Sequence, residues 1–446
     1  MSKYKPYPQY KDSGVEWLGE IPEQWESLPL KYLLSKIIDN RGRTPSFGDN
    51  GIPMLEIRNI TKGIKTPTLE FEKFVPQNIV KEYERDKVKS GDLLISTVGA
   101  TSGKTVIIQE KPNYFIAQNI VGLRVNTLTL AEYLYYFLCS DYFFTSLMLI
   151  NKGNTIDNLK VSVFINNTCF LPSLQEQQTI STYLDKATVK IDTLIEKQTK
   201  LIALLKEKRQ AVISTAVTRG LDSSVPMKES GVEWLGEIPE HWAITPLRYI
   251  GRLQNGISKG GSYFGSGFPF VNYGDIYKNG TLPLHVNGLA KSSIEDRHAY
   301  SVQKGDVFFT RTSETIDDIG MASTCLKTIE NATFSGFTIR FRQLKKVLNE
   351  NFSKYYFRTG KAQAFFEEQL NLVTRASLGQ DILKQLPVIL PSLIEQQSIA
   401  DYLDNKTTKI DNLITKATKA IELLKERRIA LISAVVTGKI DVRSAG

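Results

Sequence analysis

Several short loops of this 446-residue chain are rich in arginine, lysine, asparagine, serine and threonine. Side chains of these types bind phosphate oxygens and the edges of nucleic-acid bases, and a neighbouring glycine lets the backbone approach a phosphate closely. A solvated surface turn has the same composition, so each position also has that simpler interpretation. The candidates in the first half are Arg41, Arg43, Arg58, Asn59, Thr101, Ser102, Lys104, Lys152 and Asn154, and those in the second half are Lys259, Ser262, Tyr263, Asn272, Tyr273, Arg311, Thr312, Ser313, Arg375 and Ser377.

Residues 99–105, with the sequence GATSGKT, come nearest to a catalytic motif. They follow a strand-like run, as a nucleotide-binding P-loop would. The P-loop pattern G-x-x-x-x-G-K-[ST] needs a small residue five positions before Gly103, where the chain has Val98. The residues after Lys104 resemble a strand instead of a helix, and the second half has no counterpart. We therefore predict no nucleotide site in this loop.

The sequence gives no sign of chemistry that the chain performs alone. A methyltransferase needs a glycine-rich cofactor turn and an Asn/Asp-Pro-Pro-aromatic loop, and neither Asn-Pro-Pro nor Asp-Pro-Pro occurs in the chain. We predict a non-catalytic protein that has no metal site and no cofactor of its own. The cysteines and histidines show no metal-ligand spacing, and the cysteines are expected to be reduced thiols: Cys139, Cys169, Cys325, His241, His285 and His298.

The composition is that of a soluble globular protein with a basic bias. Hydrophobic residues make up 41% and charged residues 23%, and 56 basic against 47 acidic residues give a net charge of +9. This excess favours an anionic partner such as nucleic acid. The amino terminus lacks the apolar core of a signal peptide, and the most hydrophobic run, residues 133–150, is interrupted by polar residues. We expect a cytoplasmic protein without a membrane partner.

The candidate loops lie between two near-copies of one frame. Residues 13–23, SGVEWLGEIPE, recur at 230–240 with a shift of 217 positions. Residues 171–222 recur at 390–441 with a shift of 219, and 32 of these 52 positions are identical. The stretches between the copies barely resemble each other. A duplicated frame around two divergent inserts indicates duplicated domains that present two different binding surfaces.

Each copy of the frame ends in a long helical pattern. Ser173 is a good N-cap with Glu176 three residues later, and Gly220 and Gly438 stand where helices stop. An apolar repeat of 3.5 residues predicts coiled-coil helices of about 40 to 45 residues, or about 60 to 65 Å. Ordinary bundle helices are the alternative, but this length disfavours them. We expect the helices to pack antiparallel and to hold the inserts apart as a ruler, with these packing positions: Ile180, Leu184, Ile191, Leu194, Leu201, Leu205, Ile399, Leu403, Ile410, Leu413, Leu424 and Leu431.

The two inserts are predicted to be homologous mixed α/β domains. Residues 89–92 correspond to residues 303–306, since each segment is a turn that opens a strand. The aromatic triplets at 135–137 and 355–357, and the four tryptophans near the starts of the inserts, are predicted to serve packing. Strands are expected at 92–98, 119–125, 306–310 and 337–341, and helices near 129–150 and 348–370.

The predicted fold class is α+β, with two α/β globular domains separated by two long antiparallel coiled-coil helices in a pseudo-two-fold internal repeat. The first globular domain covers residues 1–170 and includes the leading segment. The central helical spacer covers 171–222, the second globular domain 223–389, and the C-terminal helical spacer 390–446.

This arrangement resembles the specificity subunit of type I restriction–modification enzymes. The resemblance rests on SGVEWLGEIP before each insert, on LPSLxEQQ at the start of each long helix, and on KEKR and KERR ahead of Ile-Ser-x-x-Val-Thr. It covers essentially the whole chain. It implies two target recognition domains that each read one half of a bipartite DNA sequence. It also implies that the paired helices separate these domains and hold methyltransferase subunits.

The same resemblance implies the partners. These are double-stranded DNA, two copies of a methyltransferase (modification) subunit, and restriction/translocase subunits. S-adenosylmethionine, ATP and Mg²⁺ would then belong to the partner subunits, and the two divergent inserts would give an asymmetric target. The alternative is a coiled-coil interaction scaffold whose globular heads bind protein and not DNA. Divergent loops on a shared skeleton favour DNA reading.

Overall fold

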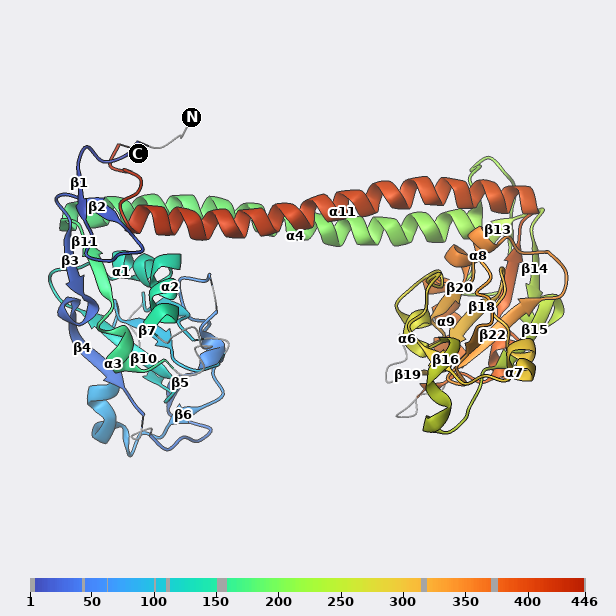
Figure 1. Cartoon of the computed structure of the whole chain (residues 1–446), viewed down its shortest axis with the longest axis horizontal. Coiled ribbons are helices and arrows are strands. Elements are labelled where there is room, and N and C mark those ends of the chain that lie inside the picture. The colour runs from blue at the N-terminus through green and yellow to red at the C-terminus, as the bar shows by residue number, and fades with distance from the viewer. Residues whose placement is uncertain are drawn as a thin grey trace. The chain divides into compact units, whose positions relative to one another are not determined.

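The computed structural model describes residues 5–41, 45–61, 63–99, 102–109, 113–150, 159–313, 319–369 and 376–444. The chain forms two compact units (Figure 1). Unit 1 contains residues 1–199 and 418–446, and unit 2 contains residues 200–417. Each long helix therefore contributes to both units. Among the described residues, no helix is long and apolar enough to cross a membrane.

A four-stranded antiparallel sheet with the order β4-β10-β7-β8 forms the centre of unit 1. A smaller sheet, β6-β5-β9, adjoins it and contains one parallel pair, β5 with β9. The elements of the first globular domain are β1 (Tyr10–Asp12), β2 (Glu20–Pro22), β3 (Glu26–Pro29), η1 (Leu30–Leu33), β4 (Leu34–Asp39), β5 (Ile52–Leu55), η2 (Ile57–Asn59), β6 (Phe74–Val75), η3 (Val80–Asp86), β7 (Leu93–Ser96), β8 (Thr105–Ile107), β9 (Phe115–Ile116), β10 (Ile120–Val125), α1 (Ala131–Leu138), α2 (Asp141–Ile150), α3 (Val161–Phe164) and β11 (Thr168–Leu171).

Unit 2 repeats this plan with the sheet order β15-β22-β18-β20 and the smaller sheet β17-β16-β21. The predicted homology of the two inserts is therefore confirmed at the level of topology. Its elements are β12 (Met227–Glu229), β13 (Glu237–Pro239), β14 (Ala243–Pro246), α5 (Leu247–Ile250), β15 (Gly251–Asn255), η5 (Gly261–Tyr263), β16 (Phe264–Val271), α6 (Tyr273–Tyr277), β17 (Leu289–Ala290), α7 (Ile294–Ala299), β18 (Val307–Thr310), β19 (Thr312–Ser313), β20 (Ala322–Thr324), β21 (Thr333–Phe334), β22 (Thr338–Gln343), α8 (Glu350–Tyr356), α9 (Gly360–Gln369), β23 (Ala376–Ser377), α10 (Gln380–Leu383) and β24 (Pro387–Leu390).

The four predicted strands are present as β7, β10, β18 and β22. The two predicted helical segments are each divided into two helices, α1 with α2 and α8 with α9. In unit 1 the break falls at Ser140, whose hydroxyl accepts a hydrogen bond from the backbone N–H of Phe143 at 3.2 Å. A serine that caps a new helix in this way competes with continuation of the preceding one. The helical segment predicted near 129–150 is therefore present, with an interruption at Ser140.

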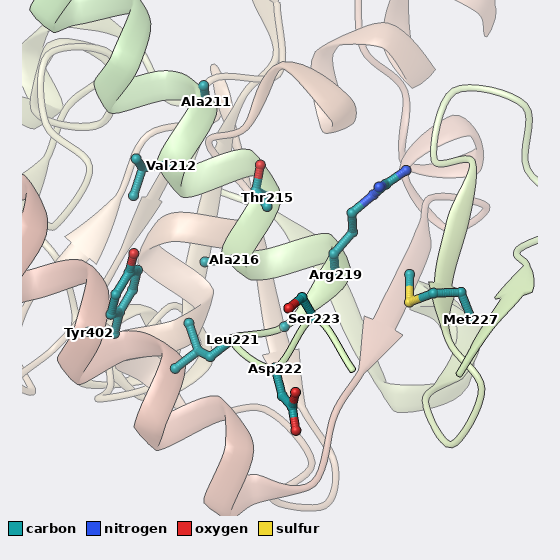
Figure 2. A pocket seen from close by; sticks show the side chains of 11 residues that line it. Ala211, Val212, Thr215, Ala216, Arg219, Leu221, Asp222, Ser223, Met227 and Tyr402 are labelled. Atoms are coloured by element: carbon teal, nitrogen blue, oxygen red, sulfur yellow. The ribbon is translucent and has the colours of Figure 1, made fainter. Parts of the chain in front are cut away.

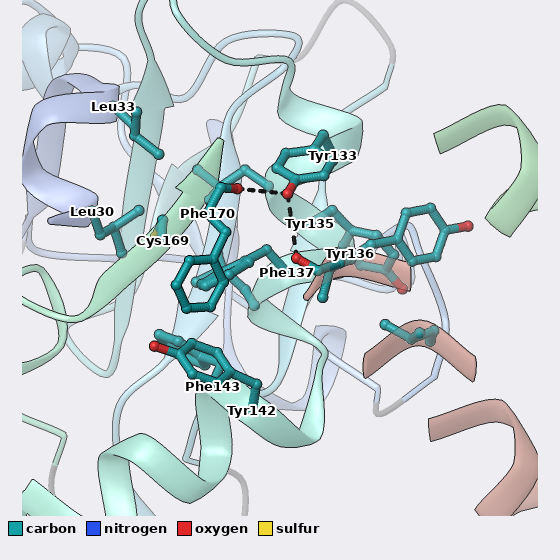
Figure 3. Close-up of a cluster of buried hydrophobic side chains, with 14 of the residues drawn as sticks. Leu30, Leu33, Tyr133, Tyr135, Tyr136, Phe137, Tyr142, Phe143, Cys169 and Phe170 are labelled. Atoms are coloured by element: carbon teal, nitrogen blue, oxygen red, sulfur yellow. Dashed lines mark hydrogen bonds between the residues drawn. The ribbon is translucent and has the colours of Figure 1, made fainter. Parts of the chain in front are cut away.

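Aromatic side chains dominate the core of unit 1 (Figure 3). Tyr135, Tyr136 and Phe137 are all buried, as predicted for the triplet. The Tyr133 hydroxyl donates to the carbonyl oxygen of Phe170 at 2.6 Å, so this buried ring has a polar partner. In the view of Figure 1, α1 and α2 lie between the central sheet and the long helices. Their aromatic residues thus connect the globular domain to the frame.

The leading segments pack through one tryptophan each. Trp25 and Trp242 are fully buried, whereas Trp17 is exposed and stacks on Tyr142 with ring centroids 5.1 Å apart. The glycine that ends each long helix lies against the buried tryptophan of the same unit. A Cβ atom on Gly220 would lie 3.2 Å from the Trp242 ring, and one on Gly438 would lie 3.4 Å from the Trp25 ring. Shared packing therefore explains why both copies retain these residues.

The long helices are α4 (Leu174–Arg219, 46 residues) and α11 (Leu393–Val436, 44 residues). They run antiparallel where they pair in each unit (Figure 1). An arginine–aspartate ion pair crosses the two helices in both units. Arg428 Nε lies 2.9 Å from Asp192 Oδ1 in unit 1, and Arg209 Nε lies 2.9 Å from Asp411 Oδ1 in unit 2. A shift of 219 positions relates these two pairs, so the internal repeat extends to the contacts.

The helix ends follow the predicted signals. Gly220 and Gly438 have φ values of +78° and +72°, the left-handed conformation that glycine adopts at helix stops. At the start of α11, Ser392 and Glu395 form both hydrogen bonds of a capping box. At the start of α4, Glu176 instead accepts a hydrogen bond from the Tyr7 hydroxyl at 2.8 Å. The leading segment of the chain thus takes over part of this cap.

Most predicted coiled-coil positions are buried or half-buried: Ile180, Leu184, Ile191, Leu205, Ile399, Leu403, Ile410, Leu424 and Leu431. Three of the predicted packing residues are not buried, because Leu194, Leu201 and Leu413 are 42–50% exposed. A two-helix pair has no third layer along its middle, so one side of the apolar stripe faces solvent there. The expectation that these three leucines are buried within the chain was therefore wrong.

Candidate nucleic-acid interface

In unit 1, three of the predicted loops start at one end of the central sheet. Asp39 at the end of β4 pairs with Val121 of β10, and Ile120 beside it pairs with Ser96 at the end of β7. Arg41 follows β4, and residues 97–99 and 102–104 lie between β7 and β8. The backbone N–H of Leu159 donates to the carbonyl of Thr97 at 2.6 Å. The chain that follows the predicted loop at 151–154 therefore returns to the same end of the sheet.

Unit 2 gathers its loops in the same way. The end of β15 and the end of β18 flank the start of β22, since Asn255 pairs with Ile339 and Thr310 pairs with Thr338. Strand β19 then pairs with β23, which places Thr312 opposite Ser377. The backbone N–H of Leu378 donates to the carbonyl of Arg311 at 2.7 Å, the counterpart of the Leu159–Thr97 bond. Two loops that were predicted separately thus form one surface.

Several candidates in these loops are held by acidic neighbours. Arg41 forms an ion pair with Asp39 at 2.6 Å. Lys259 pairs with Asp296 at 2.9 Å, and the Tyr263 hydroxyl donates to the same carboxylate at 2.8 Å. The hydrogen bond from Lys259 contributes most to lowering the pKa of Asp296 to about 2. Ser262, next to Tyr263, is exposed. This cluster therefore holds an ordered cation and an aromatic ring at the loop surface.

The predicted pairs 58–59 and 272–273 occupy equivalent places after β5 and β16, the strands that pair in parallel with β9 and β21. Asn59 is 1% exposed, and its amide donates to the carbonyls of Thr68 and Glu70. In this conformation Asn59 holds its own loop and has no free donor for a base. Arg58 bridges two carboxylates, those of Glu56 and Glu72.

In unit 2 the equivalent asparagine is more accessible. Asn272 is exposed at the start of α6, and its backbone N–H donates to Asp275 Oδ2 at 2.8 Å. Tyr273 is half-buried and stacks on Tyr277 with ring centroids 5.8 Å apart. Of the two pairs, the second therefore presents more polar surface to a ligand.

The glycine-rich loop after β7 has the geometry of a hairpin turn. The backbone N–H of Gly103 donates to the carbonyl of Ser96 at 2.8 Å, and strand β8 begins at Thr105. Ser102 and Lys104 are half-buried within this turn. A phosphate-binding P-loop leads into a helix N-terminus, which β8 replaces here. The expectation that a strand, and not a helix, follows Lys104 is therefore confirmed.

Some sequence-predicted positions lie outside the described residues, namely Arg43, Thr101, Lys152, Asn154 and Arg375. One accessible residue escaped the sequence reasoning. Phe337 was predicted as the first residue of a strand, yet it precedes β22 and is 64% exposed. Its carbonyl accepts the backbone N–H of Arg311 at 3.0 Å, which places an aromatic ring beside the predicted loop. The preceding Gly336 was the only local signal that the strand starts later.

Other parts of the described chain carry no comparable cluster. Cys139, Cys169 and Cys325 are free thiols, and no group of three or more His, Cys, Asp or Glu among the described residues could hold a metal ion. A cavity of about 530 Å³ lies at the end of α4 in unit 2 (Figure 2). It contains none of the predicted loop residues, and its lining mixes apolar and polar side chains: Ala211, Val212, Thr215, Ala216, Arg219, Gly220, Leu221, Asp222, Ser223, Met227 and Tyr402.

Comparison with known proteins gives one family for both halves of the chain. Residues 22–204 and 242–423 each match the family described as type I restriction modification DNA specificity domain. The chain is 23% identical over 447 residues to the type I restriction enzyme EcoKI specificity subunit of Escherichia coli (strain K12). That alignment covers 95% of this chain and 91% of the relative.

Solved structures share the fold. One chain, described under complex assembly and conformational transition of the type I R-M system, superposes with a TM-score of 0.68 at 15% identity, covering 94% of this chain and 99% of that chain. The HsdS subunit from Thermoanaerobacter tengcongensis superposes with a TM-score of 0.55 at 14% identity, covering 94% and 98%. The two family matches together span most of the sequence. The chain therefore belongs to the type I restriction–modification DNA specificity family, and its function is DNA target recognition.

Proposed function

We propose that the chain selects a bipartite, asymmetric DNA target, with unit 1 reading one half and unit 2 reading the other. One observation carries this proposal: two units with the same sheet order gather loops of different sequence at the same end of that sheet. A shared scaffold fixes where the loops lie, and the different side chains on them supply different hydrogen-bond donors and acceptors. The long helices then set the unread spacer between the two half-sites.

We further propose that two methyltransferase subunits dock on the long helices. Among the leucines that the long helices expose, Leu194 and Leu423 lie in unit 1, and Leu413 and Leu204 lie in unit 2. The internal repeat relates the two pairs, since a shift of 219 positions converts Leu194 to Leu413 and Leu204 to Leu423. Two equivalent apolar patches match two copies of one partner. On this proposal, methylation, ATP-driven translocation and cleavage, with S-adenosylmethionine, ATP and Mg²⁺, belong to partner subunits.

Methylation mapping of the complete complex tests the reading of DNA. Arg311→Ala, in the loop cluster of unit 2, should relax the sequence required at one half-site and leave the other half-site and the spacer unchanged. Loss of a bidentate base contact costs about 1–3 kcal/mol of discrimination. Arg248→Ala is the matched control, because Arg248 is exposed in the same unit but precedes β15 at the opposite end of the sheet. Relaxation at both half-sites would contradict the division of labour.

Subunit stoichiometry tests the docking. Leu194→Glu combined with Leu423→Glu should reduce the bound methyltransferase subunits from two to one, as should Leu204→Glu with Leu413→Glu. Leu69→Glu, an exposed leucine outside the helices, is the control. Native mass spectrometry gives the count directly. If neither the chain nor its complex shifts DNA in a salt-dependent manner, the protein-interaction scaffold is the better description.

A further inference from the structure

A second cavity of unit 2, of about 760 Å³, lies where the globular domain meets the long helices. None of the predicted loop residues line it. Three segments form its walls: the paired helices, the chain after α6, and the end of α8. The lining residues are Arg209, Gln210, Ile213, Lys278, Gly280, Thr281, Lys354, Tyr355, Arg358, Asp404, Thr407, Thr408 and Asp411.

Positive charge exceeds negative charge in this lining, with four cations against two carboxylates. Each carboxylate already has a cationic partner. Asp404 pairs with Lys354 at 2.6 Å, and Asp411 pairs with Arg209 at 2.9 Å. Two cations, Lys278 and Arg358, therefore remain without a balancing charge in the lining. A net excess of two positive charges around one hollow favours an anion.

Of these two cations, Arg358 gives the stronger evidence for an anion site. Its guanidinium donates to the backbone carbonyls of Tyr277 at 2.7 Å and Ala322 at 3.5 Å. Within the described part of the chain, no carboxylate lies within ion-pair distance of it. Burial lowers the pKa of Arg358, and the nearby charge of Arg209 lowers it further. A half-buried guanidinium beside a second cation is an unfavourable arrangement that a bound anion would relieve.

Unit 1 shows which contacts occupy the equivalent place. The repeat relates Asp404 to Asp185 and Arg209 to Arg428. In unit 1, Lys65 Nζ pairs with Asp185 at 2.5 Å, and Arg428 donates to the carbonyl of Gly63 at 3.0 Å. The segment around Lys65 thus contacts both helices directly and covers their polar surface.

The corresponding segment of unit 2 has lost this filling side chain. The backbone carbonyl of Lys65 accepts a hydrogen bond from the backbone N–H of Ile107 in β8. At the equivalent point of β20, the backbone N–H of Thr324 donates to the carbonyl of Gly280. Gly280 therefore stands where unit 1 has Lys65. Without that side chain a hollow remains. Of the cations that line it, Lys354 lies in α8 and Arg358 follows that helix. In unit 1 these two positions are Tyr135 and Cys139. Unit 2 thus has a basic cavity where unit 1 has the ion pair of Lys65 with Asp185.

We propose that this cavity binds a phosphate group, held by Arg358, Lys278 and Arg209. A guanidinium offers paired donors to a phosphate, and the hydroxyls of Thr281 and Thr408 line the same space. The phosphate belongs either to the DNA backbone or to a small free phosphate. A DNA source rests on the proposed function, whereas a free source does not. In either case the site carries no sequence information, since phosphates are identical at every step.

Two measurements on the full-length chain test the site. In the first, inorganic phosphate should raise the melting temperature above that in chloride of equal ionic strength, and Lys278→Ala and Arg358→Gln should abolish this rise. In the second, binding to duplexes of unrelated sequence is measured between 50 and 200 mM salt. Each variant should reduce the slope of log K against log salt by about 1, or about fourfold less salt sensitivity over that range.

Lys278 is exposed, so Lys278→Ala tests the site even if Arg358→Gln fails to fold. Lys345→Ala removes an exposed lysine of unit 2 outside the cavity, and Arg219→Gln removes the arginine of the cavity in Figure 2; both should match the unaltered chain. If a variant loses the stabilisation by inorganic phosphate while its salt slope stays unchanged, the group bound in the cavity is a free phosphate. Equal melting temperatures in phosphate and chloride, with unaltered slopes, would overturn the inference. If the chain alone binds no duplex, the phosphate measurement decides the site, and the proposed function is then decided by DNA binding of the complete complex.

Discussion

Each unit contains a buried aspartate at the same position of the repeat. Replacing one and then the other compares the same ion pair in two related environments, so that each unit serves as the control for the other. Asp306 accepts hydrogen bonds from Arg342 Nε and Nη2, both at 2.6 Å, and from the backbone N–H of Gln303 at 2.8 Å. Asp92 makes the equivalent bonds in unit 1, to Arg124 at 2.8 and 2.7 Å and to Lys89 at 2.6 Å. An asparagine keeps the shape of the side chain and removes its charge. The substitution therefore isolates the ion pair within the turn that opens each strand.

The two variants should differ because unit 2 contains a second arginine. Arg340 is 7% exposed, and burial, reinforced by the charge of Arg342, lowers its pKa to about 10. Its counterpart in unit 1 is Gly122, since both residues pair with equivalent positions of the central sheet. Breaking a buried ion pair costs about 3–5 kcal/mol. Asp92→Asn leaves one partly exposed arginine and should cost about 3 kcal/mol, whereas Asp306→Asn leaves two arginines and should cost about 5 kcal/mol.

Hydrogen exchange resolved by peptide measures both effects in one molecule. Amides of β18 and β22 report on Asp306→Asn, and amides of β7 and β10 report on Asp92→Asn, each relative to the same strands in the unaltered chain. A difference of about 2 kcal/mol corresponds to roughly a 30-fold difference in the two accelerations. The double variant Asp306→Asn with Arg342→Gln should recover part of the loss. Equal acceleration in the two units would refute the role assigned to Arg340.

Three further outcomes are expected. Insertion of four residues into both long helices should lengthen the unread spacer by about one to two base pairs without changing the bases read, because a helical turn is about 5.4 Å and a base-pair step about 3.4 Å; new half-site bases in methylation mapping would contradict this. Gly438→Ala should destabilise unit 1 more than Gly220→Ala destabilises unit 2. Both glycines have positive φ, but the new Cβ of residue 438 would lie 2.2 Å from Pro22, whereas that of residue 220 would lie 3.2 Å from Trp242. Equal shifts in peptide exchange would argue against the clash. Burial opposes ionisation of Glu395, yet hydrogen bonds from His241, Ser392 and Trp242 hold its pKa at about 2. Its contribution to the start of α11 should therefore be complete above about pH 4.3 and be lost as the pH falls through about 2, and Glu395→Gln should remove this dependence from amide exchange.

Features encoded locally could be predicted from the sequence. The repeat and the 3.5-residue period depend on residues a few positions apart, so they indicated the long helices and their stops at Gly220 and Gly438. The homology of the inserts followed from the matched turns before Asp92 and Asp306. The period also shows which face of a helix is apolar, but not how many neighbours cover it. The exposure of Leu194, Leu201 and Leu413 therefore required the structure.

Contacts between distant segments could not be predicted in this way. Asparagine is a residue type that binds base edges, so the sequence made Asn59 a candidate. Only its hydrogen bonds to the carbonyls of Thr68 and Glu70 show that it holds its own loop. The basic cavity depends on Gly280 standing where the other unit has Lys65, a correspondence visible only because the equivalent strands β8 and β20 donate equivalent hydrogen bonds to these two residues. The sequences of the two inserts have diverged too far to align such residues. Their equivalence can be recognised only from their places relative to the sheet, which the two units share.

The composition of unit 1 has a consequence for synthesis of the chain. Its core includes Ile432, Val435, Val436 and Val442, which are made after unit 2, together with buried residues between 7 and 184, which are made before unit 2. Unit 2 is continuous, so all of its segments are available before residue 418 is added. At about 5–20 residues per second, the first part of unit 1 waits roughly 10 to 45 seconds for its closing helix. The second unit can therefore fold before the first, and a premature stop before residue 432 would damage the core of the unit whose other residues precede unit 2.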